Sequence, residues 1–260
     1  MKLSEVINKV VSYNKFESDN DINFFKRVYN NGDLEKYENR IKAIDFINKD
    51  CILDAGCGFG QWSIAFSKFN KKVIGTDADS FRIKVVQDIA SEMSLDNVKF
   101  ETCSMESIPY EDGYFDAIFS YNAITLGPYR KILKEFYRVL KVGGYLYFNA
   151  ADLGWFIYNI IDQHNSASDF SSRQWAIDTI KNTLQYYATN NFIQVDHRDS
   201  LLIPKEIVKK DLSDLGFEVV AIEGDGLINL TKNNIVNSFF PSEKYGLPAV
   251  YEVLCKKINK

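Results

Sequence analysis

The sequence predicts an α/β fold with a doubly wound, parallel sheet, and three observations along the chain lead to this fold class. Strand-like and helix-like segments alternate over residues 51–150 at the spacing that parallel strands with crossover helices require. The same rhythm returns over residues 204–258, after a helical stretch at 151–203 that interrupts it. Before this alternation the pattern is helical. We therefore expect a single domain over residues 1–260, with helices at its start and a helical insertion after the fifth strand.

Residues 1–48 predict helices only. Leu3, Ile7 and Val10 recur at the spacing of one helical face, and a second apolar face follows before Asn31-Gly32. A third helix, with Asp33 as its expected N-cap, carries the next set of periodic apolar residues.

The remaining elements follow from the period of the apolar residues. Ser80 is the expected cap of the helix after the second strand, and the KVGG sequence at 141–144 is the expected turn before the fifth. Pro204 suits the first turn of the last helix, and Gly216 suits its end. The predicted strands lie at residues 52–53, 71–77, 97–103, 114–120, 145–150, around 219–220 and at 249–258, and the helices of the insertion at 155–161 and 175–187.

Composition narrows the function class. The chain has a formal net charge of −4, which argues against a nucleic-acid backbone as its main partner. Its longest apolar run, near Trp155, is far shorter than the roughly 18 residues of a membrane-spanning helix, and its start lacks the apolar core of a secretory signal. The four cysteines have no Cys-x-x-Cys spacing, so we expect buried thiols in a reducing cytoplasm and no metal site.

The stretch Cys51–Gly60 is the feature around which the chain is organised. A short apolar strand runs into a turn with glycine at every second position, and an amphipathic helix follows. In this arrangement backbone N–H groups and a helix N-terminus face a ligand. A dinucleotide site favours Gly-x-Gly-x-x-Gly, whereas here position 61 is Gln. Asp54, directly before the loop, suits a ligand with an ammonium group better than one with two phosphates.

The sequence DAGCGFG at residues 54–60 resembles motif I of the class I S-adenosylmethionine-dependent methyltransferases. Further along, VIGTDAD is similar to the family's second strand, SMESIPYEDGYFDAIFS to its adenine-contacting turn and fourth strand, and FYRVLKVGGYLYF to the entry into the fifth. LSDLGFEVVAI is similar to the sixth strand and its preceding helix. The resemblance covers roughly residues 40–150 and 204–258. It implies a mostly parallel, seven-stranded Rossmann-like sheet with an antiparallel last strand.

The resemblance also implies a cofactor, S-adenosylmethionine, with S-adenosylhomocysteine as the product. The loop glycines and Asp54 would hold the methionine part, Asp77 both ribose hydroxyls, and Ser104 with Met105 the adenine. Ser104 departs from the family, many members of which carry an acid there. The implied cofactor-binding residues are Asp54, Gly56, Cys57, Gly58, Gly60, Asp77, Ala78, Ser104, Met105 and Ser120.

Methyl transfer from a sulfonium is an in-line displacement that needs no metal, but a hydroxyl or ammonium acceptor must lose a proton. The two histidines, His164 and His197, both lie in the insertion and are the candidate bases, although a surface or structural histidine is the commoner case. His197 is preferred, because acidic residues flank it. Tyr121, just after the fourth strand, is the third catalytic candidate and is expected to line the acceptor pocket.

These observations favour a cytoplasmic methyltransferase that acts on an O or N atom of a small molecule such as a metabolite, sugar or amine. Residues 1–48, with Tyr29, Tyr37 and Arg40, and the insertion at 151–203 would form a lid over the acceptor. No nucleic acid and no membrane is expected as a partner, and a homodimer is left open. The alternatives are a catalytically silent cofactor-binding subunit and an NAD-dependent oxidoreductase.

Overall fold

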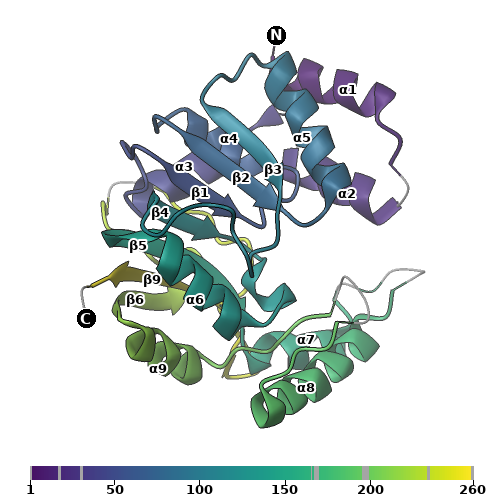
Figure 1. Cartoon of the computed structure of the whole chain (residues 1–260). Coiled ribbons are helices and arrows are strands. Elements are labelled where there is room, and N and C mark those ends of the chain that lie inside the picture. The colour runs from purple at the N-terminus through teal and green to yellow at the C-terminus, as the bar shows by residue number, and fades with distance from the viewer. Residues whose placement is uncertain are drawn as a thin grey trace.

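The computed structural model describes most of the chain, and Figure 1 shows its arrangement. The described residues are 2–16, 19–29, 32–164, 166, 170–194, 199–232 and 235–258, with the side chains of 19 and 20 excepted. His197 and its neighbour Asp196 lie outside the described residues.

Seven strands form one twisted sheet in the order β3-β2-β1-β4-β5-β9-β6. The first five strands of the sheet order run parallel, and β9 runs antiparallel to both of its neighbours, β5 and β6. The fold class predicted from the sequence is therefore confirmed. The strands are β1 (Ile52–Ala55), β2 (Val73–Asp77), β3 (Val98–Thr102), β4 (Phe115–Ser120), β5 (Leu140–Ala151), β6 (Phe217–Gly224) and β9 (Val250–Lys257).

Helices cover both faces of this sheet. On one face the core contains the inner sides of the N-terminal helices and of the helices after β1 and β2, and on the other face those of the helices after β4 and before β6. Neighbouring residues of β1 belong to opposite cores, Ile52 to the first and Leu53 to the second. This explains why the strand is apolar at consecutive positions. The helices are α1 (Leu3–Tyr13), α2 (Asp19–Tyr29), α3 (Glu35–Ala43), α4 (Gln61–Ser67), α5 (Ser80–Glu92), α6 (Tyr129–Val139) and α9 (Lys205–Leu215).

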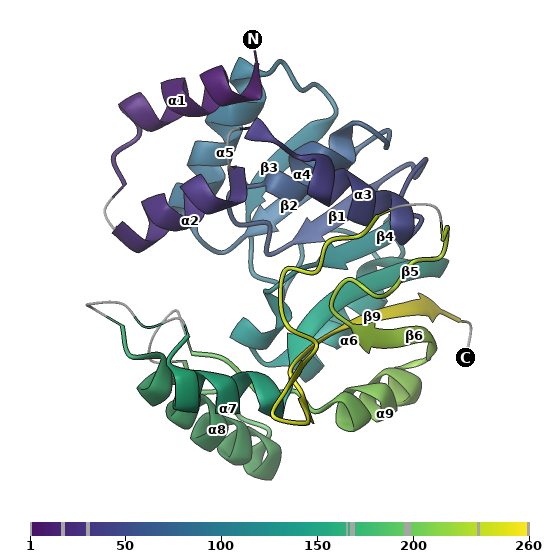
Figure 2. The same cartoon turned by 180° about the vertical axis from the view of Figure 1, so that it is seen from behind.

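The stretch after β5 contains the two expected helices, α7 (Leu153–Asp162) and α8 (Ser172–Thr189), which pack on each other. A small hairpin of β7 (Glu243–Lys244) and β8 (Leu247–Pro248), which was not predicted, contacts α7. Figures 1 and 2 show α1 and α2 on one side of the molecule and α7 and α8 on the other. The edge at which the parallel strands end lies between these two groups of helices.

Three local predictions were wrong. Asp79, not Ser80, caps α5, because its Oδ1 accepts from the backbone N–H groups of Phe81 and Arg82 at 2.9 and 3.2 Å. The N-cap position of α3 is Leu34, although Asp33 still accepts from the backbone N–H of Glu35 at 2.8 Å. The KVGG sequence is not a turn between elements, since β5 already begins at residue 140 and contains a register shift against β4.

Candidate cofactor and acceptor site

The glycine loop connects β1 to α4 and is docked on β2. The backbone N–H groups of Gly56 and Cys57 both donate to the carbonyl of Thr76 at 2.8 Å. Gly56, Gly58 and Gly60 all have positive φ, of 75°, 55° and 77°. This is the left-handed region that L-residues with a side chain rarely adopt.

Two of these glycines also lie too close to their neighbours for a side chain. A Cβ at Gly56 would lie 2.3 Å from the Cβ of Ala123, and one at Gly60 would lie 2.2 Å from Cγ2 of Val86. At Gly58 the nearest atom would be Cε1 of the Phe24 ring, at an ordinary contact distance of 3.6 Å. The loop is therefore held closely at its two ends and is bounded in its middle by an aromatic ring from α2.

Asp54, the third residue of β1, is a buried carboxyl directly beneath this loop, 1% exposed. Burial raises its pKa to about 7, with a smaller contribution from the nearby Asp77, while a hydrogen bond from the Ser63 hydroxyl (2.5 Å) acts in the opposite direction. Within the part of the chain that the structure describes, no lysine or arginine forms an ion pair with it. A buried carboxylate without a cation is a site at which a ligand's ammonium group would be stabilised.

Asp77 ends β2 next to the loop, as the sequence predicted. Its Oδ2 accepts from the backbone N–H of Gly58 at 2.8 Å, and its Oδ1 accepts from that of Asp79 at 2.9 Å. Each carboxylate oxygen retains a lone pair for a further donor. Ala78 follows on the exposed side. Because Asp77 orients the middle of the glycine loop, the two motifs form one unit.

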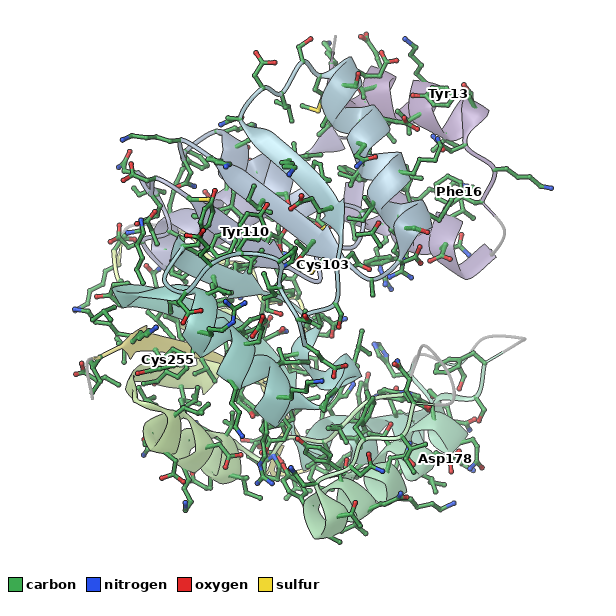
Figure 3. All side chains as sticks on the ribbon, viewed as in Figure 1. Tyr13, Phe16, Cys103, Tyr110, Asp178 and Cys255 are labelled. Atoms are coloured by element: carbon green, nitrogen blue, oxygen red, sulfur yellow. The ribbon has the colours of Figure 1, made fainter. Side chains whose placement is uncertain are left out.

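The turn after β3 brings Ser104 and Met105 to the same edge of the sheet. Figure 3 labels Cys103, where the chain leaves β3 and enters this turn. The sulfur of Met105 lies 3.9 Å from the hydroxyl of Ser120, the last residue of β4, and 3.6 Å from the position of a Cβ on Gly56. Met105, Ser120 and Gly56 therefore converge, whereas Ser104 uses its hydroxyl to accept from the backbone N–H of Glu106 at 3.2 Å.

Two buried polar atoms near the loop have no hydrogen-bond partner among the described residues: Oε1 of Gln61 and Oγ1 of Thr76. Gln61 is the first residue of α4, and Thr76 precedes Asp77 on β2. Together with the Asp54 carboxyl, which has no ion-pair partner among the described residues, they leave this region with hydrogen-bonding groups that those residues do not satisfy. These acceptor oxygens fit an S-adenosylmethionine-type ligand, which donates from an ammonium group and from ribose hydroxyls.

A small pocket lies beyond the ends of β4 and β5, with a cavity volume of about 20 Å³. This is room for about one water molecule. Among the described residues its lining contains no charged side chain, and it is formed by Asn122, Thr125, Asn149, Ala150, Ala151, Trp155, Phe240 and Val250. Asn149 accepts from the backbone N–H of Asn122 at 2.5 Å. The pocket joins the strand ends to α7 through Trp155, and to the segment between β6 and β9 through Phe240.

Tyr121 lies beside this pocket but directs its hydroxyl into the protein, where it donates to Oδ1 of Asp225 at 2.6 Å. Burial, followed by the charge of Asp225, raises its pKa well above the usual value, although Arg40 acts in the opposite direction. The hydroxyl therefore stays protonated near neutral pH. His164 is exposed at the end of α7, where its Nδ1 lies 2.9 Å from the Tyr158 hydroxyl.

A buried ionic cluster around Arg40 was missed at the sequence level. Arg40 is fully buried in α3, and its Nη1 donates to Glu252 at 2.7 Å, to Asp225 at 3.3 Å and to the Tyr147 hydroxyl at 2.8 Å. Asp225 also accepts from the backbone N–H of Phe239 at 2.6 Å. The position of Arg40 on the same helical face as the apolar residues of α3 was the signal that could have revealed it.

Tyr29 and Tyr37, named with Arg40 as lid residues, are also buried. The Tyr29 hydroxyl donates to the carbonyl of Phe59 at 2.5 Å, and the Tyr37 hydroxyl donates to that of Val28 at 2.8 Å. These residues attach the N-terminal helices to the glycine loop and to each other. In the described ranges no group of three metal-ligating side chains occurs, and no helix there is long and apolar enough to cross a membrane.

Comparison with known proteins finds methyltransferases. The model of a family described as a methyltransferase domain matches residues 52–144. An uncharacterized methyltransferase of Bacillus subtilis, YcgJ, is 37% identical over 105 residues, which are 40% of this chain and 42% of that protein. A demethylmenaquinone methyltransferase of Oceanobacillus iheyensis is 27% identical over 136 residues, 51% of this chain and 55% of the relative. The chain thus spans about half the length of the curated relatives it matches.

Solved structures show the same fold. A geranyl diphosphate methyltransferase in complex with S-adenosylmethionine superimposes with a TM-score of 0.61 at 16% identity, over 86% of this chain and 85% of that one. The crystal structure of B. subtilis YcgJ gives a TM-score of 0.56 at 18% identity, over 86% and 99% of the two chains. Identities this low establish the fold alone. Residues 52–144 thus match a methyltransferase domain, the fold around them is the Rossmann-like fold of the solved methyltransferases, and the loop motifs resemble those of the class I S-adenosylmethionine-dependent enzymes.

Proposed function

We propose that the protein is an S-adenosylmethionine-dependent methyltransferase that methylates an O or N atom of a small-molecule acceptor. The observation that carries the proposal is the buried, cation-free carboxyl of Asp54 beneath a loop whose glycines have positive φ. When bound, the cofactor supplies an electrophilic methyl group on a sulfonium. The residues of this chain then have to bind it, orient the acceptor and exclude water.

Each predicted cofactor residue has a proposed task that its position supports. Asp54 would stabilise the ammonium of the methionine part, and the backbone of Gly56 and Gly58 would allow it to approach closely. Asp77, with a free lone pair on each oxygen, would accept from the ribose hydroxyls. Met105 would pack against the adenine. The remaining predicted contacts are Cys57, Gly60, Ala78, Ser104 and Ser120.

The pocket beyond β4 and β5 is the proposed start of the acceptor site. Its side chains are amides, a hydroxyl, aromatic rings and aliphatic groups, so it favours an uncharged acceptor over a strongly anionic one. The volume of about 20 Å³ requires Trp155 or Phe240 to move before a metabolite can enter. Residues 151–203 would then act as the cover of the acceptor, as expected from the sequence.

The proton-removing residue is proposed among His164 and His197. His164 is separated from the pocket by Trp155, whose ring meets the imidazole edge-on with 6.2 Å between the centroids. A movement of Trp155 that opens the pocket would therefore also remove the ring that separates His164 from the acceptor. Tyr121, with its raised pKa, suits a hydrogen-bonding task better than that of a base.

The net charge and the cysteines decide which partners and which compartment we propose. A nucleic-acid substrate is not proposed, because the net charge is −4, although an rRNA methyltransferase of Francisella tularensis is 29% identical over 114 residues, only 25% of that relative. We keep the cytoplasm as the proposed compartment, since all four cysteines are unpaired thiols.

Calorimetry with S-adenosylhomocysteine tests the proposal. The wild type should bind, and Asp77→Ala should bind about 10- to 100-fold more weakly, because hydrogen bonds to a charged group contribute about 1.5–3 kcal/mol. Asp50→Ala is the matched control, since Asp50 is an exposed aspartate that pairs with Lys71 away from the site. No binding by the wild type, or equal binding by Asp77→Ala, would reject the cofactor assignment.

Two further measurements separate the alternatives. Transfer of tritium from methyl-labelled cofactor to a pool of cell metabolites should label at least one product if the protein is an enzyme. A protein that binds the cofactor and labels nothing is the silent subunit. Tight binding of NADH in a fluorescence titration, without binding of S-adenosylhomocysteine, would favour the oxidoreductase instead.

A further inference from the structure

Helix α2 lies across the glycine loop and is attached to α5 near its start and to the loop at its end. Near its start, Asp21 pairs with Arg82 of α5 at 2.7 Å. At its last residue, the Tyr29 hydroxyl donates to the carbonyl of Phe59 at 2.5 Å. Arg82 follows Asp77 on the ribose side, and Phe59 belongs to the loop itself. One end of α2 is therefore held by the helix that follows the Asp77 motif, and the other end by the glycine loop itself.

Between these two attachments, Phe24 covers the middle of the loop. Its ring is the only group among the described residues within 4 Å of the position that a Cβ on Gly58 would occupy. It also packs against Phe59, with 5.7 Å between the ring centroids, and under the guanidinium of Arg82 at 5.6 Å. Gly58 is the residue whose backbone N–H donates to Asp77. Phe24 thus borders the place where the glycine loop and the ribose-binding acid meet.

An aromatic network extends this contact into the core. Phe25, the neighbour of Phe24, is buried and meets Phe59 edge-on at 5.2 Å. Phe16, labelled in Figure 3, contacts Phe59 and Phe81 with centroid distances of 5.9 and 5.2 Å. This network anchors the apolar side of α2. Phe24 itself is only partly buried, so part of its ring remains available to a ligand.

We propose that Phe24 is a cofactor-contacting residue and that α2 forms a cover over the cofactor, held by Asp21–Arg82 at one end and Tyr29–Phe59 at the other. This inference rests on the proposed function. It assigns α2 to the cofactor rather than to the acceptor. Loss of the Phe24 ring removes apolar contact from the bound cofactor and speeds its dissociation. Loss of the partly exposed Asp21–Arg82 pair loosens the cover without removing a contact to the cofactor.

Stopped-flow and calorimetric binding of S-adenosylhomocysteine test this assignment. Phe24→Ala should raise both Kd and the dissociation rate about ten-fold, and Phe24→Leu should have a smaller effect because it keeps apolar cover. Asp21→Asn should raise the association and dissociation rates together, with Kd within about two-fold of the wild type. The control is Tyr13→Ala, which removes an aromatic ring that is 51% exposed at the end of α1 (Figure 3) and should leave binding unchanged.

Hydrogen exchange of the wild type provides a measurement that does not depend on any variant. S-adenosylhomocysteine should slow exchange over residues 22–29 as well as over 56–60 and 77–82. Slowing in the loop and at the ribose side without slowing in 22–29 overturns the inference, and so does Phe24→Ala with wild-type Kd and dissociation rate. A wild type that does not bind at all overturns the proposed function, and with it this inference.

Discussion

Replacing Asp54 with asparagine should stabilise the ligand-free protein and weaken cofactor binding. The reason for the first effect is that the ligand-free fold contains this buried carboxyl at an energetic cost. Burial raises its pKa from 3.8 to about 7. The folded state therefore holds the proton more tightly than the unfolded state does. The stabilising effect of this proton is complete below pH 3.8 and is lost as the pH rises towards 7.

The magnitude follows from the pKa difference. About three pH units at about 1.4 kcal/mol each correspond to about 4 kcal/mol of destabilisation above pH 7, as an upper value. At pH 5.5 the same linkage corresponds to about 2 kcal/mol of destabilisation. The amide introduced by Asp54→Asn keeps an oxygen that can accept from the Ser63 hydroxyl but carries no charge. The advantage of Asp54→Asn in unfolding free energy should therefore grow by about 2 kcal/mol between pH 5.5 and pH 8.

Urea unfolding of both proteins without ligand at these two pH values measures the difference, followed by fluorescence and circular dichroism together to check for a single transition. Calorimetry with S-adenosylhomocysteine at pH 8 should show weaker binding by Asp54→Asn, because the ammonium loses its carboxylate. A stability difference that does not change with pH would refute the reasoning, since an uncharged cause such as packing would then explain it.

Two other predictions concern the core and the loop. Arg40→Met should lower the unfolding free energy by about 3–5 kcal/mol, because it leaves the carboxylates of Asp225 and Glu252 buried without their cation. Urea unfolding measures this loss, and an unchanged unfolding midpoint would contradict it. Gly60→Ala should destabilise the fold by about 2–4 kcal/mol and abolish S-adenosylhomocysteine binding, because strain at φ 77° adds to a 2.2 Å contact with Val86. In its control, Gly143→Ala, φ is 80° and the new Cβ would meet no described residue within 4 Å apart from its chain neighbours, so this variant should cost only the strain of about 1 kcal/mol. Equal losses in both variants would show that contact plays no part.

Much of the fold could be predicted because its signals are local. The alternation of apolar segments located the strands of the parallel sheet, and Gly216 ends α9 in the left-handed region with φ 106°, as expected for a helix stop. The errors were also local. Asp79 and Ser80 are both good caps, and only the hydrogen bonds to Phe81 and Arg82 decide between them.

The candidate site was predicted unevenly. Asp54 was located by its position directly before the loop and Asp77 by its position at a strand end, and the structure brings both to the glycine loop. The insertion after β5 was recognised as helical, but its contact with the β7–β8 hairpin was not, because two-residue strands have no periodicity to detect. The placement of His164 behind Trp155 likewise depends on how α7 packs.

The sequence by itself determined the order of elements, the conformation of the glycine loop and the two acids beside it, because backbone sterics and apolar periodicity act within a few residues of the chain. Only the tertiary structure decided the acidic partners of Arg40, which lie 185 and 212 residues away, and the contact between Phe24 and Gly58. Residues of the same types occur at many other positions in the chain, so the sequence alone does not select the pair that makes contact. That choice depends on how the helices pack on the sheet, and packing is a property of the whole folded chain.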